Sequence, residues 1–324
     1  MVKLASAEMA EKKLATRAAF GATLAELAEE GVPVVAVDAD LTGSTTTKKF
    51  AAAAPENADK LFNCGIAEQN MIDVAAGLAL TGHVAYTGSF AVFGTGRAYD
   101  QIRNTVCYSN LDVKICPTHA GVSVGPDGGS HQMLEDVSLM RGLPNMRVLV
   151  PADYAAARAA IKLAAKTPGP VYVRMGRAAV PCVYDDDVEL EIGRAYVLRE
   201  GSDATVVACG VEIREALAAA DALAEEGISI EVIDAFSVKP LDEDTITASV
   251  AKTGCCVVAE EHSVHGGLGS AVAECLARKN PAPCEFVGVQ DRFGKSGEFE
   301  ELLGYFNLDA AAIVEAVQRA RGRK

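Results

Sequence analysis

Short runs of apolar and β-branched residues alternate with longer Ala-rich segments of helical period in the first half of the chain. The strand-like runs occupy residues 34–37, 83–87, 113–117, 147–150 and 171–174. The helical segments occupy residues 7–30, 68–80, 96–109, 133–141 and 155–165. Such alternation is typical of βαβ units and predicts a mainly parallel sheet with helices on both faces.

A second block of alternating strand-like and helical segments follows a stretch with a different pattern. Residues 176–193 contain three consecutive aspartates and show no helical period, so we expect an interdomain linker at about residues 176–200, which can include an edge strand. Beyond it the pattern predicts strands at 204–209, 229–234, 255–260 and 285–289, and helices at 212–226, 269–277 and 309–321. The 324 residues are therefore expected to form two consecutive three-layer α/β domains, residues 1–188 and 189–324.

The composition argues against several classes of function. With 30 Lys and Arg against 44 Asp and Glu, the net charge is −14, which disfavours nucleic acid and membrane surfaces as partners. No apolar run is long enough to span a bilayer, and charges interrupt the N-terminal apolar residues, so we predict neither a transmembrane helix nor a signal peptide. The nine cysteines lack CxxC spacing, which predicts no disulfide framework, no metal site and a reducing, cytoplasmic location.

Two motifs at predicted strand ends contain candidate functional residues. Residues 63–71 run through Gly65 into a helix with Glu68 in its first turn. This acid either complements the helix dipole or serves as a functional carboxylate at the carboxyl edge of the sheet, where ligands bind. In residues 86–100, Phe90 and Phe93 lie three positions apart, a spacing found in cores more often than in cofactor platforms. The Gly-Thr-Gly that follows lacks the Gly-Lys-Ser/Thr of a phosphate loop.

Two further stretches are rich in glycine. Residues 117–131 form a long loop that contains His119, Asp127 and His131. Ordering such a loop is costly, so we predict that it binds a ligand, although its histidines lack metal-ligand spacing. Residues 260–270 end in Gly-Gly-Leu-Gly-Ser before a helix. They could hold an anion at the helix N-terminus, but tight strand–helix packing is the simpler explanation.

Together, these motifs resemble the second half of transketolase, a thiamine diphosphate enzyme, and in particular the C-terminal subunit of a transketolase split over two polypeptides. The resemblance covers nearly the whole chain. It is also carried by residues 12–17 (KKLATR), 38–44 (DADLTGS), 174–177 (RMGR), 232–241 (VIDAFSVKPL) and 266–270 (GGLGS). It implies a pyrimidine-binding domain followed by the transketolase C-terminal domain.

The resemblance also implies a missing part. The complete enzyme of this family has a preceding domain that binds the diphosphate through Mg2+ and is marked by Gly-Asp-Gly and a later Asn. This chain contains no Gly-Asp-Gly. The resemblance therefore implies a partner subunit that carries this motif and the Mg2+ site, with the active site at the interface. The family expectation is an α2β2 heterotetramer in which this chain also pairs with itself.

For the cofactor, the resemblance assigns roles to four residues. Glu68 matches the catalytic carboxylate that bonds to N1′ of the aminopyrimidine and favours its imino tautomer, which then removes the thiazolium C2 proton. Phe93 matches the aromatic residue that stacks on the pyrimidine, and Phe90 lies close by. Asp40 matches an acid near the thiazolium.

For the substrate, the resemblance implies contacts with a sugar phosphate. His119 and Asp127 match residues that contact the sugar hydroxyls, and His131 matches a second catalytic residue at the hydroxyls or the phosphate. The phosphate clamp would consist of Arg17, Ser44 and Arg177. Arg174 is either a further clamp residue or the solvated end of a strand.

The implied reaction is reversible transfer of a two-carbon ketol unit from a ketose phosphate to an aldose phosphate, as in pentose phosphate metabolism. Residues 65–69 (GIAEQ), with Ala67 where many transketolases have Arg, also occur in 1-deoxy-D-xylulose-5-phosphate synthase. The corresponding half of that or another thiamine diphosphate enzyme is therefore an alternative, although the β subunit of 2-oxo acid dehydrogenases lacks the sugar-phosphate residues. A non-catalytic binding or regulatory relative is a second alternative, which the joint retention of the site residues disfavours.

Overall fold

The first sheet forms where the sequence has continuous apolar runs. In the computed structural model, which describes residues 2–324, every residue of β2 (Val34–Asp38) and β4 (Val84–Gly88) is buried, as expected for strands covered on both faces. The strand order is β12-β6-β7-β5-β4-β2-β3. All neighbours are parallel except β12. The remaining strands are β3 (Leu61–Asn63), β5 (Val113–Ile115), β6 (Arg147–Leu149), β7 (Val171–Val173) and β12 (Ser237–Lys239).

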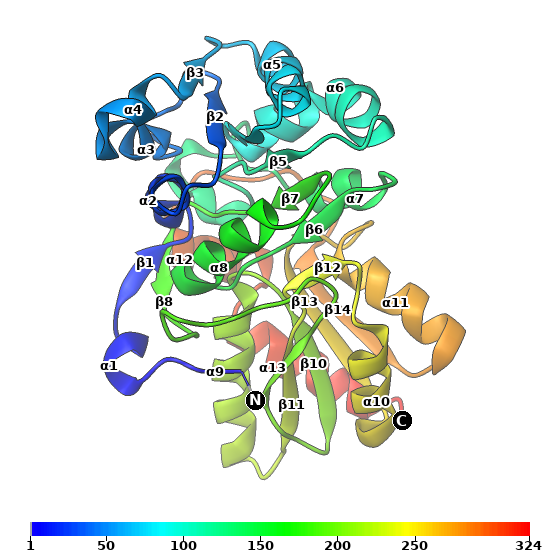
Figure 1. Ribbon diagram of the computed structural model, residues 1–324. Coiled ribbons are helices and arrows are strands. Elements are labelled where there is room, and N and C mark those ends of the chain that lie inside the picture. Colours follow the sequence, from blue (N-terminus) through cyan, green and yellow to red (C-terminus); the bar gives the residue numbers. More distant parts are fainter. Residues whose placement is uncertain (1) are drawn as a thin grey trace.

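Helices cover both faces of this sheet (Figure 1). The buried residues of α2 (Ala18–Glu29) and α8 (Tyr154–Ala165) belong to one hydrophobic core. Those of α5 (Glu68–Leu80) and α7 (Asp136–Arg141) belong to a second core on the opposite face. The short helices α3 (Thr47–Ala53) and α4 (Pro55–Ala58) connect β2 to β3.

The second sheet has the order β14-β13-β10-β11-β9, and only β9 is antiparallel to its neighbour. Side chains of β10 alternate between the two cores, since Val206 lies in one and Val207 in the other. Helices α9 and α13 cover one face, and α10 and α11 cover the other. The bounds are β9 (Tyr196–Arg199), β10 (Ala204–Ala208), β11 (Ile230–Asp234), β13 (Cys256–Ser263), β14 (Cys284–Val289), α9 (Glu212–Glu225), α10 (Glu243–Thr253), α11 (Leu268–Lys279) and α13 (Ala310–Arg321).

The α/β fold class with two consecutive units is confirmed, but one helix prediction was wrong and another segment is helical with a different helix type. Residues 7–30 do not form one helix: α1 (Ala7–Ala10) is followed by β1 (Lys13–Ala15), which pairs with β8 (Ala179–Pro181) before α2 begins. Helix propensity is a weak preference, and the long-range strand pairing overrides it. Residues 96–109 lie in two π-helical segments, Val92–Arg97 and Ile102–Tyr108, which flank α6 (Tyr99–Gln101).

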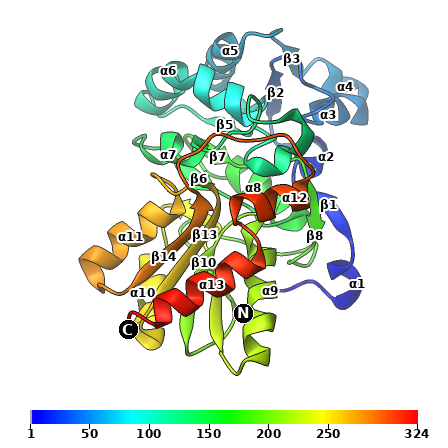
Figure 2. The same ribbon diagram turned by 180° about the vertical axis from the view of Figure 1, so that it is seen from behind.

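The two units share several elements. Strand β12 comes from the second half of the chain but extends the first sheet. Figure 2 shows the segment after β14 crossing from the second unit to the first, where α12 (Phe299–Phe306) packs on the 3-10 turn η3 (Val122–Asp127). The sequence pattern predicted neither β12 nor α12. The two halves of the chain are therefore interlocked rather than joined only by a linker.

The expectations drawn from the composition concern membrane-spanning helices and the state of the cysteines. Among residues 2–324, no helix combines the length and apolar character needed to cross a membrane. All nine cysteines are free thiols, and seven of them are buried. The cysteines thus act mainly as small apolar side chains of the core.

A single buried carboxylate, Asp153, ties α8 to the segment that connects the units. Its Oδ1 caps α8 by accepting from Ala156 N–H (2.8 Å), while its Oδ2 accepts from the N–H groups of Val183 (2.5 Å) and Tyr184 (2.8 Å). Asp309 caps α13 through one bond only, from Ala312 N–H (3.0 Å).

We expect Asp153→Ala to lower the free energy of unfolding by about 3 kcal/mol, because it removes a helix cap and leaves two further N–H groups without an acceptor. The matched variant Asp309→Ala, which removes a cap alone, should lower it by about 1 kcal/mol. Urea denaturation followed by circular dichroism measures both values. Equal losses would show that the bonds to residues 183 and 184 contribute nothing.

Candidate active site

The candidate residues come from loops at one edge of the first sheet. Glu68 follows β3, Phe90 follows β4 and His119 follows β5. Ser44 follows β2, and Arg177 follows β7. Because these five strands are parallel, their carboxyl ends meet at the same edge, which is where ligands bind in open α/β sheets.

Aromatic and imidazole rings form the centre of this edge. The ring of Phe90 stacks on His119 with centroids 3.8 Å apart and lies 6.2 Å from the nearly parallel ring of Phe93. His131 meets Phe93 edge-on at 5.5 Å. Phe93 is only half-buried. The two phenylalanines therefore form a platform at the site, in which Phe90 is buried and Phe93 is partly exposed.

The Glu68 carboxylate lies beside this platform. Its side chain is 1% exposed and accepts a hydrogen bond of 2.8 Å from Nη1 of Arg97, whose side chain is 49% exposed. The Arg97 guanidinium also covers the Phe93 ring at 4.7 Å. Sequence reasoning did not assign Arg97 to the site. The four-residue spacing from Phe93 within a helical segment was the signal that could have placed both side chains together.

Two arginines converge on the far side of the cluster. Arg17 donates to the Ser44 carbonyl (2.9 Å), and Arg177 donates to the Val124 carbonyl (2.6 Å). Burial and the nearby Arg177 charge lower the pKa of Arg17, while Asp127 acts in the opposite direction. The charges of the two guanidinium groups repel each other. They create a subsite that favours an anion, and the planar fork of Arg suits phosphate oxygens.

His119 is a neutral imidazole in this environment. Burial, followed by the charges of Arg17 and Arg177 and by His131, lowers the pKa of His119 to about 3. Its Nδ1 lies 2.7 Å from the Thr118 hydroxyl. His119 can therefore donate or accept a hydrogen bond at neutral pH without adding a charge.

The structure brings together most of the predicted residues, but not Asp40 and Arg174. Asp40 is exposed and forms two hydrogen bonds with Asn63 at the end of β3: its N–H donates to Asn63 Oδ1 (3.1 Å), and its Oδ1 accepts from Asn63 Nδ2 (3.3 Å). Arg174 is buried and pairs with Asp136 at 2.7 Å. It is therefore not a solvated strand end, and it belongs to the junction of the two units rather than to the anion subsite.

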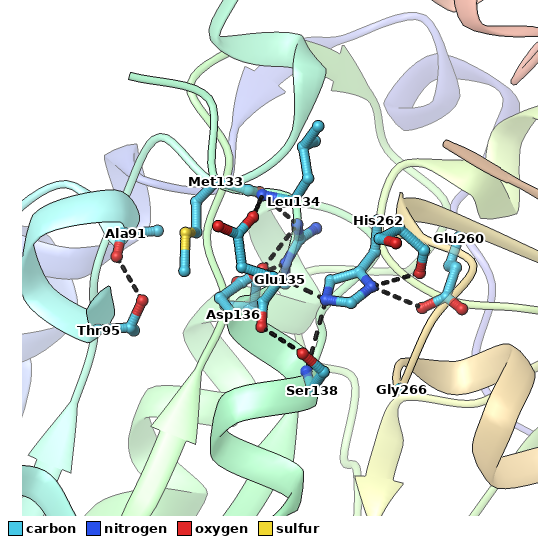
Figure 3. Close-up of polar contacts among 12 residues, drawn as sticks. Ala91, Thr95, Met133, Leu134, Glu135, Asp136, Ser138, Glu260, His262 and Gly266 are labelled. Atoms are coloured by element: carbon cyan, nitrogen blue, oxygen red, sulfur yellow. Dashed lines mark hydrogen bonds and ion pairs between the residues drawn. The ribbon is translucent and has the colours of Figure 1, made fainter. Parts of the chain in front are cut away.

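That junction contains a buried polar network. Figure 3 shows His262 of β13 between Asp136 and Ser138 of α7 on one side and Glu260 on the other. The His262 Nε2 accepts from Ser138 N–H (3.4 Å) and lies 4.0 Å from Asp136, while Nδ1 lies 3.7 Å from Glu260. Glu260 itself accepts from the N–H groups of Leu268 (2.7 Å) and Gly269 (2.8 Å). The first turn of α11 is thus occupied by a side chain of this protein and is not available to a bound anion.

The cluster at the sheet edge fits an aminopyrimidine ring. Among residues 2–324, Arg97 is the hydrogen-bond partner found for the Glu68 carboxylate, and it engages one oxygen, Oε2. The other oxygen is available to a protonated ring nitrogen, and the half-buried Phe93 supplies an aromatic ring beside it. The described residues contain no group of three or more His, Cys, Asp or Glu side chains that could hold a metal ion.

Comparisons with known proteins agree with this geometry. The family pattern of the transketolase pyrimidine-binding domain matches residues 12–183, and that of the transketolase C-terminal domain matches residues 193–313. A Methanocaldococcus jannaschii protein described as a transketolase C-terminal section is 45% identical over 304 residues, which cover 93% of this chain and 94% of that protein.

Two further relatives are also single subunits. A 6-deoxy-6-sulfo-D-fructose transketolase subunit from Clostridium sp. (strain MSTE9) is 42% identical, with 93% of this chain and 92% of that protein covered. A solved structure described as a split gene transketolase, an inactive beta4 tetramer, is 49% identical with a TM-score of 0.87, and covers 96% of this chain and 99% of that one.

The chain belongs to the transketolase family, whose members are thiamine diphosphate enzymes. Within this family it is a subunit of a split transketolase, corresponding to the C-terminal section of the enzyme.

The low pKa of His119 leads to a prediction on pH. We expect its imidazole NMR signals to stay at neutral-form positions between about pH 5 and 8. Because its pKa of about 3 is below that of an unfolded histidine, the contribution of His119 to stability is full above about pH 6.5 and is lost as the pH falls toward 3. His119→Gln should remove this part of the pH dependence. Titration of the His119 signals near pH 6.5 would contradict the prediction.

Proposed function

We propose that this chain holds the pyrimidine half of thiamine diphosphate and the sugar substrates, and that it catalyses reversible transfer of a two-carbon ketol unit between sugar phosphates. The observation that carries the proposal is the buried Glu68 carboxylate beside the Phe93 platform, on the same sheet edge as the Arg17 and Arg177 pair. The first part suits an aminopyrimidine, and the second suits a phosphate group.

In this proposal each residue near the cofactor has one task. When bound, thiamine diphosphate supplies the nucleophilic carbon and the electron sink for cleavage of a carbon–carbon bond. Glu68 holds the proton at N1′ and so selects the ring tautomer. Phe93 and Phe90 stack against the pyrimidine, and we place Asp40 on the thiazolium side. Arg97 keeps Glu68 paired in the free chain and leaves one carboxylate oxygen for N1′.

The substrate would lie between the platform and the two arginines. Arg17 and Arg177 hold its phosphate, with Ser44 beside Arg17. His119 and Asp127 bond to the hydroxyls, and His131, which lies 5.5 Å from the Phe93 ring, is placed to hold or move a proton at a substrate oxygen. Fixing the phosphate remotely would orient the reacting carbonyl.

We further propose that a partner subunit with Gly-Asp-Gly…Asn supplies Mg2+ binding and the diphosphate site, and that the assembly is an α2β2 heterotetramer in the cytoplasm, with this chain also pairing with itself. The absence of Gly-Asp-Gly from the sequence supports this view. So do exposed apolar side chains in and beside the helical segments of residues 68–80 and 102–108. Ile66 is 78% exposed, and Leu80 and Tyr108 at the ends of neighbouring helical segments are 73% and 88% exposed.

The proposal can be tested by purifying the tagged full chain from its native cells and identifying co-purifying proteins by mass spectrometry. We expect a partner that contains Gly-Asp-Gly…Asn. Calorimetry should show Mg2+-dependent binding of thiamine diphosphate by the complex and much weaker binding by this chain alone. The complex should transfer a ketol unit from a ketose phosphate to ribose 5-phosphate. Tight, Mg2+-dependent binding by the isolated chain would contradict the shared site, and pyruvate-dependent synthesis would favour the alternative enzyme.

The Glu68 assignment has a test of its own. We expect Glu68→Gln to lower kcat of the assembled enzyme by about a hundredfold or more, because the amide cannot exchange the proton at N1′. The control Asp73→Asn lies on the same helix α5 but is exposed, and it should keep normal turnover. Circular dichroism checks that both variants fold. Normal turnover of Glu68→Gln would exclude the carboxylate from proton transfer.

A further inference from the structure

A carboxylate of the second unit contacts the substrate loop of the first unit. Glu261 of β13 has a side chain that is 3% exposed, and its Oε1 accepts a hydrogen bond from the backbone N–H of Ser123. Ser123 lies in η3, between His119 and Asp127. The Glu261 carbonyl in turn accepts from Arg174 (2.9 Å), so the backbone at Glu261 is fixed to the first sheet.

The end of the same loop is held by a second contact. The carboxamide of Gln132 pairs with the backbone of Lys295, since its Nε2 donates to the Lys295 carbonyl (2.9 Å) and its Oε1 accepts from the Lys295 N–H (2.8 Å). The same Nε2 donates to the Val122 carbonyl (3.1 Å). Gln132, next to His131, therefore connects the C-terminal end of the loop and the Val122 carbonyl within it to the segment that crosses from the second unit.

Glycines in the loop allow this close contact. A Cβ on Gly121, at φ +79°, would lie 2.2–2.5 Å from the Glu261 carboxylate. A Cβ on Gly128, at φ +77°, would lie 2.2 Å from the Ser296 hydroxyl. A side chain at either position would force the Glu261 carboxylate or the Ser296 hydroxyl to move. The glycine content of residues 117–131 thus serves docking between the units as well as ligand binding.

We propose that Glu261 and Gln132 are positioning residues, through which the second unit holds the loop that carries His119, Asp127 and His131 in its substrate-binding form. The proposal rests on the proposed function for the identity of the substrate. The contacts of Glu261 and Gln132 that hold the loop, here called the loop clamp, are a property of the chain itself. The loop clamp gives the C-terminal domain a direct part in sugar binding, in addition to building the interface.

The loop clamp does not depend on the charge of Glu261. Burial raises the pKa of this carboxyl to about 7, against the opposing charge of Arg174 and the bond from Ser123, and Asp136 adds to the rise. Glu212, also buried, faces the same carboxylate. Both the neutral and the ionised form keep an oxygen that can accept from Ser123 N–H. Glu261→Gln should therefore keep the hydrogen bond from Ser123 N–H, whereas Glu261→Ala should lose it.

The first measurement is hydrogen–deuterium exchange of the full chain without partner or cofactor. We expect amides within residues 121–131 to exchange about tenfold faster in Glu261→Ala than in the wild type, because the variant loses one hydrogen bond that closes the loop. Glu261→Gln should restore the wild-type rate. Gln132→Ala, which removes no charge, should accelerate the same amides. Unchanged exchange in both alanine variants would overturn the proposal.

The second measurement uses the enzyme assembled with its partner. For Glu261→Ala we expect KM for the sugar phosphate to rise about tenfold with a smaller loss of kcat, and we expect Glu261→Gln to behave as the wild type. The matched control is Glu260→Gln on the same strand. Glu260 bonds to α11 and not to the loop, so this variant should shift Tm but not KM.

The two measurements distinguish a failure of the loop clamp from a failure of the proposed function. Faster exchange in Glu261→Ala together with a wild-type complex that transfers no ketol unit would refute the proposed function and leave the loop clamp intact. An equal rise of KM in Glu260→Gln and Glu261→Ala would instead show a general loss of stability and would overturn the positioning role.

Discussion

The buried pair of Arg174 and Asp136 is the interaction on which the site depends. Burial alone would raise the pKa of Asp136, but the adjacent Arg174 charge and the Tyr172 hydroxyl hold the pKa of that carboxyl below its ordinary value. Arg174 also donates to the carbonyls of Met133 (3.4 Å) and Glu261 (2.9 Å). One guanidinium therefore links β7, the end of the substrate loop, α7 and β13. Removing either partner would leave an unpaired buried charge, at a cost of about 3–5 kcal/mol.

The site on the sheet edge keeps its positive side chains apart from its negative one and holds a neutral histidine beside the positive charges. The positive charges of Arg17 and Arg177 lie at one end, where they suit a phosphate, and burial together with those same charges keeps His119 neutral. Glu68 lies at the other end, in a buried position balanced by Arg97. A neutral imidazole next to two arginines can contact a hydroxyl without competing for the anion. Glu68, Ser44 and Arg177 follow different strands of one parallel sheet, and Arg17 is held at the same edge by its bond to the Ser44 carbonyl.

Features that arise from residues close together in the sequence were predicted well, whereas features that arise from contacts between distant residues were missed. Helix α5 was predicted at residues 68–80 and has those bounds, because its apolar spacing and its limits are local signals. The N-terminal helix failed because the partner of β1 lies more than 150 residues away, in β8. Most residues proposed from the family motifs follow strands that end at one sheet edge, whereas Arg174 is buried at the junction of the two units. Glu261 was missed because it meets Ser123 across 138 positions. Arg97 was missed although its four-residue spacing from Phe93 is a local signal, because its other partner, Glu68, lies 29 positions earlier in the chain.

The buried contacts between the two units also determine how this chain could be divided. The linker is only one of several connections, since β12 extends the first sheet and Gln132 pairs with Lys295. A cut between the units would separate Glu261 from Ser123 and Arg174, and His262 from Ser138 and Asp136. Such buried polar groups are costly when unpaired, so the pyrimidine-binding and C-terminal domains depend on each other for their folded form. The division of a transketolase into subunits is then expected to spare this junction and to fall where the contact surface is apolar and exposed in the free chain, as around Ile66.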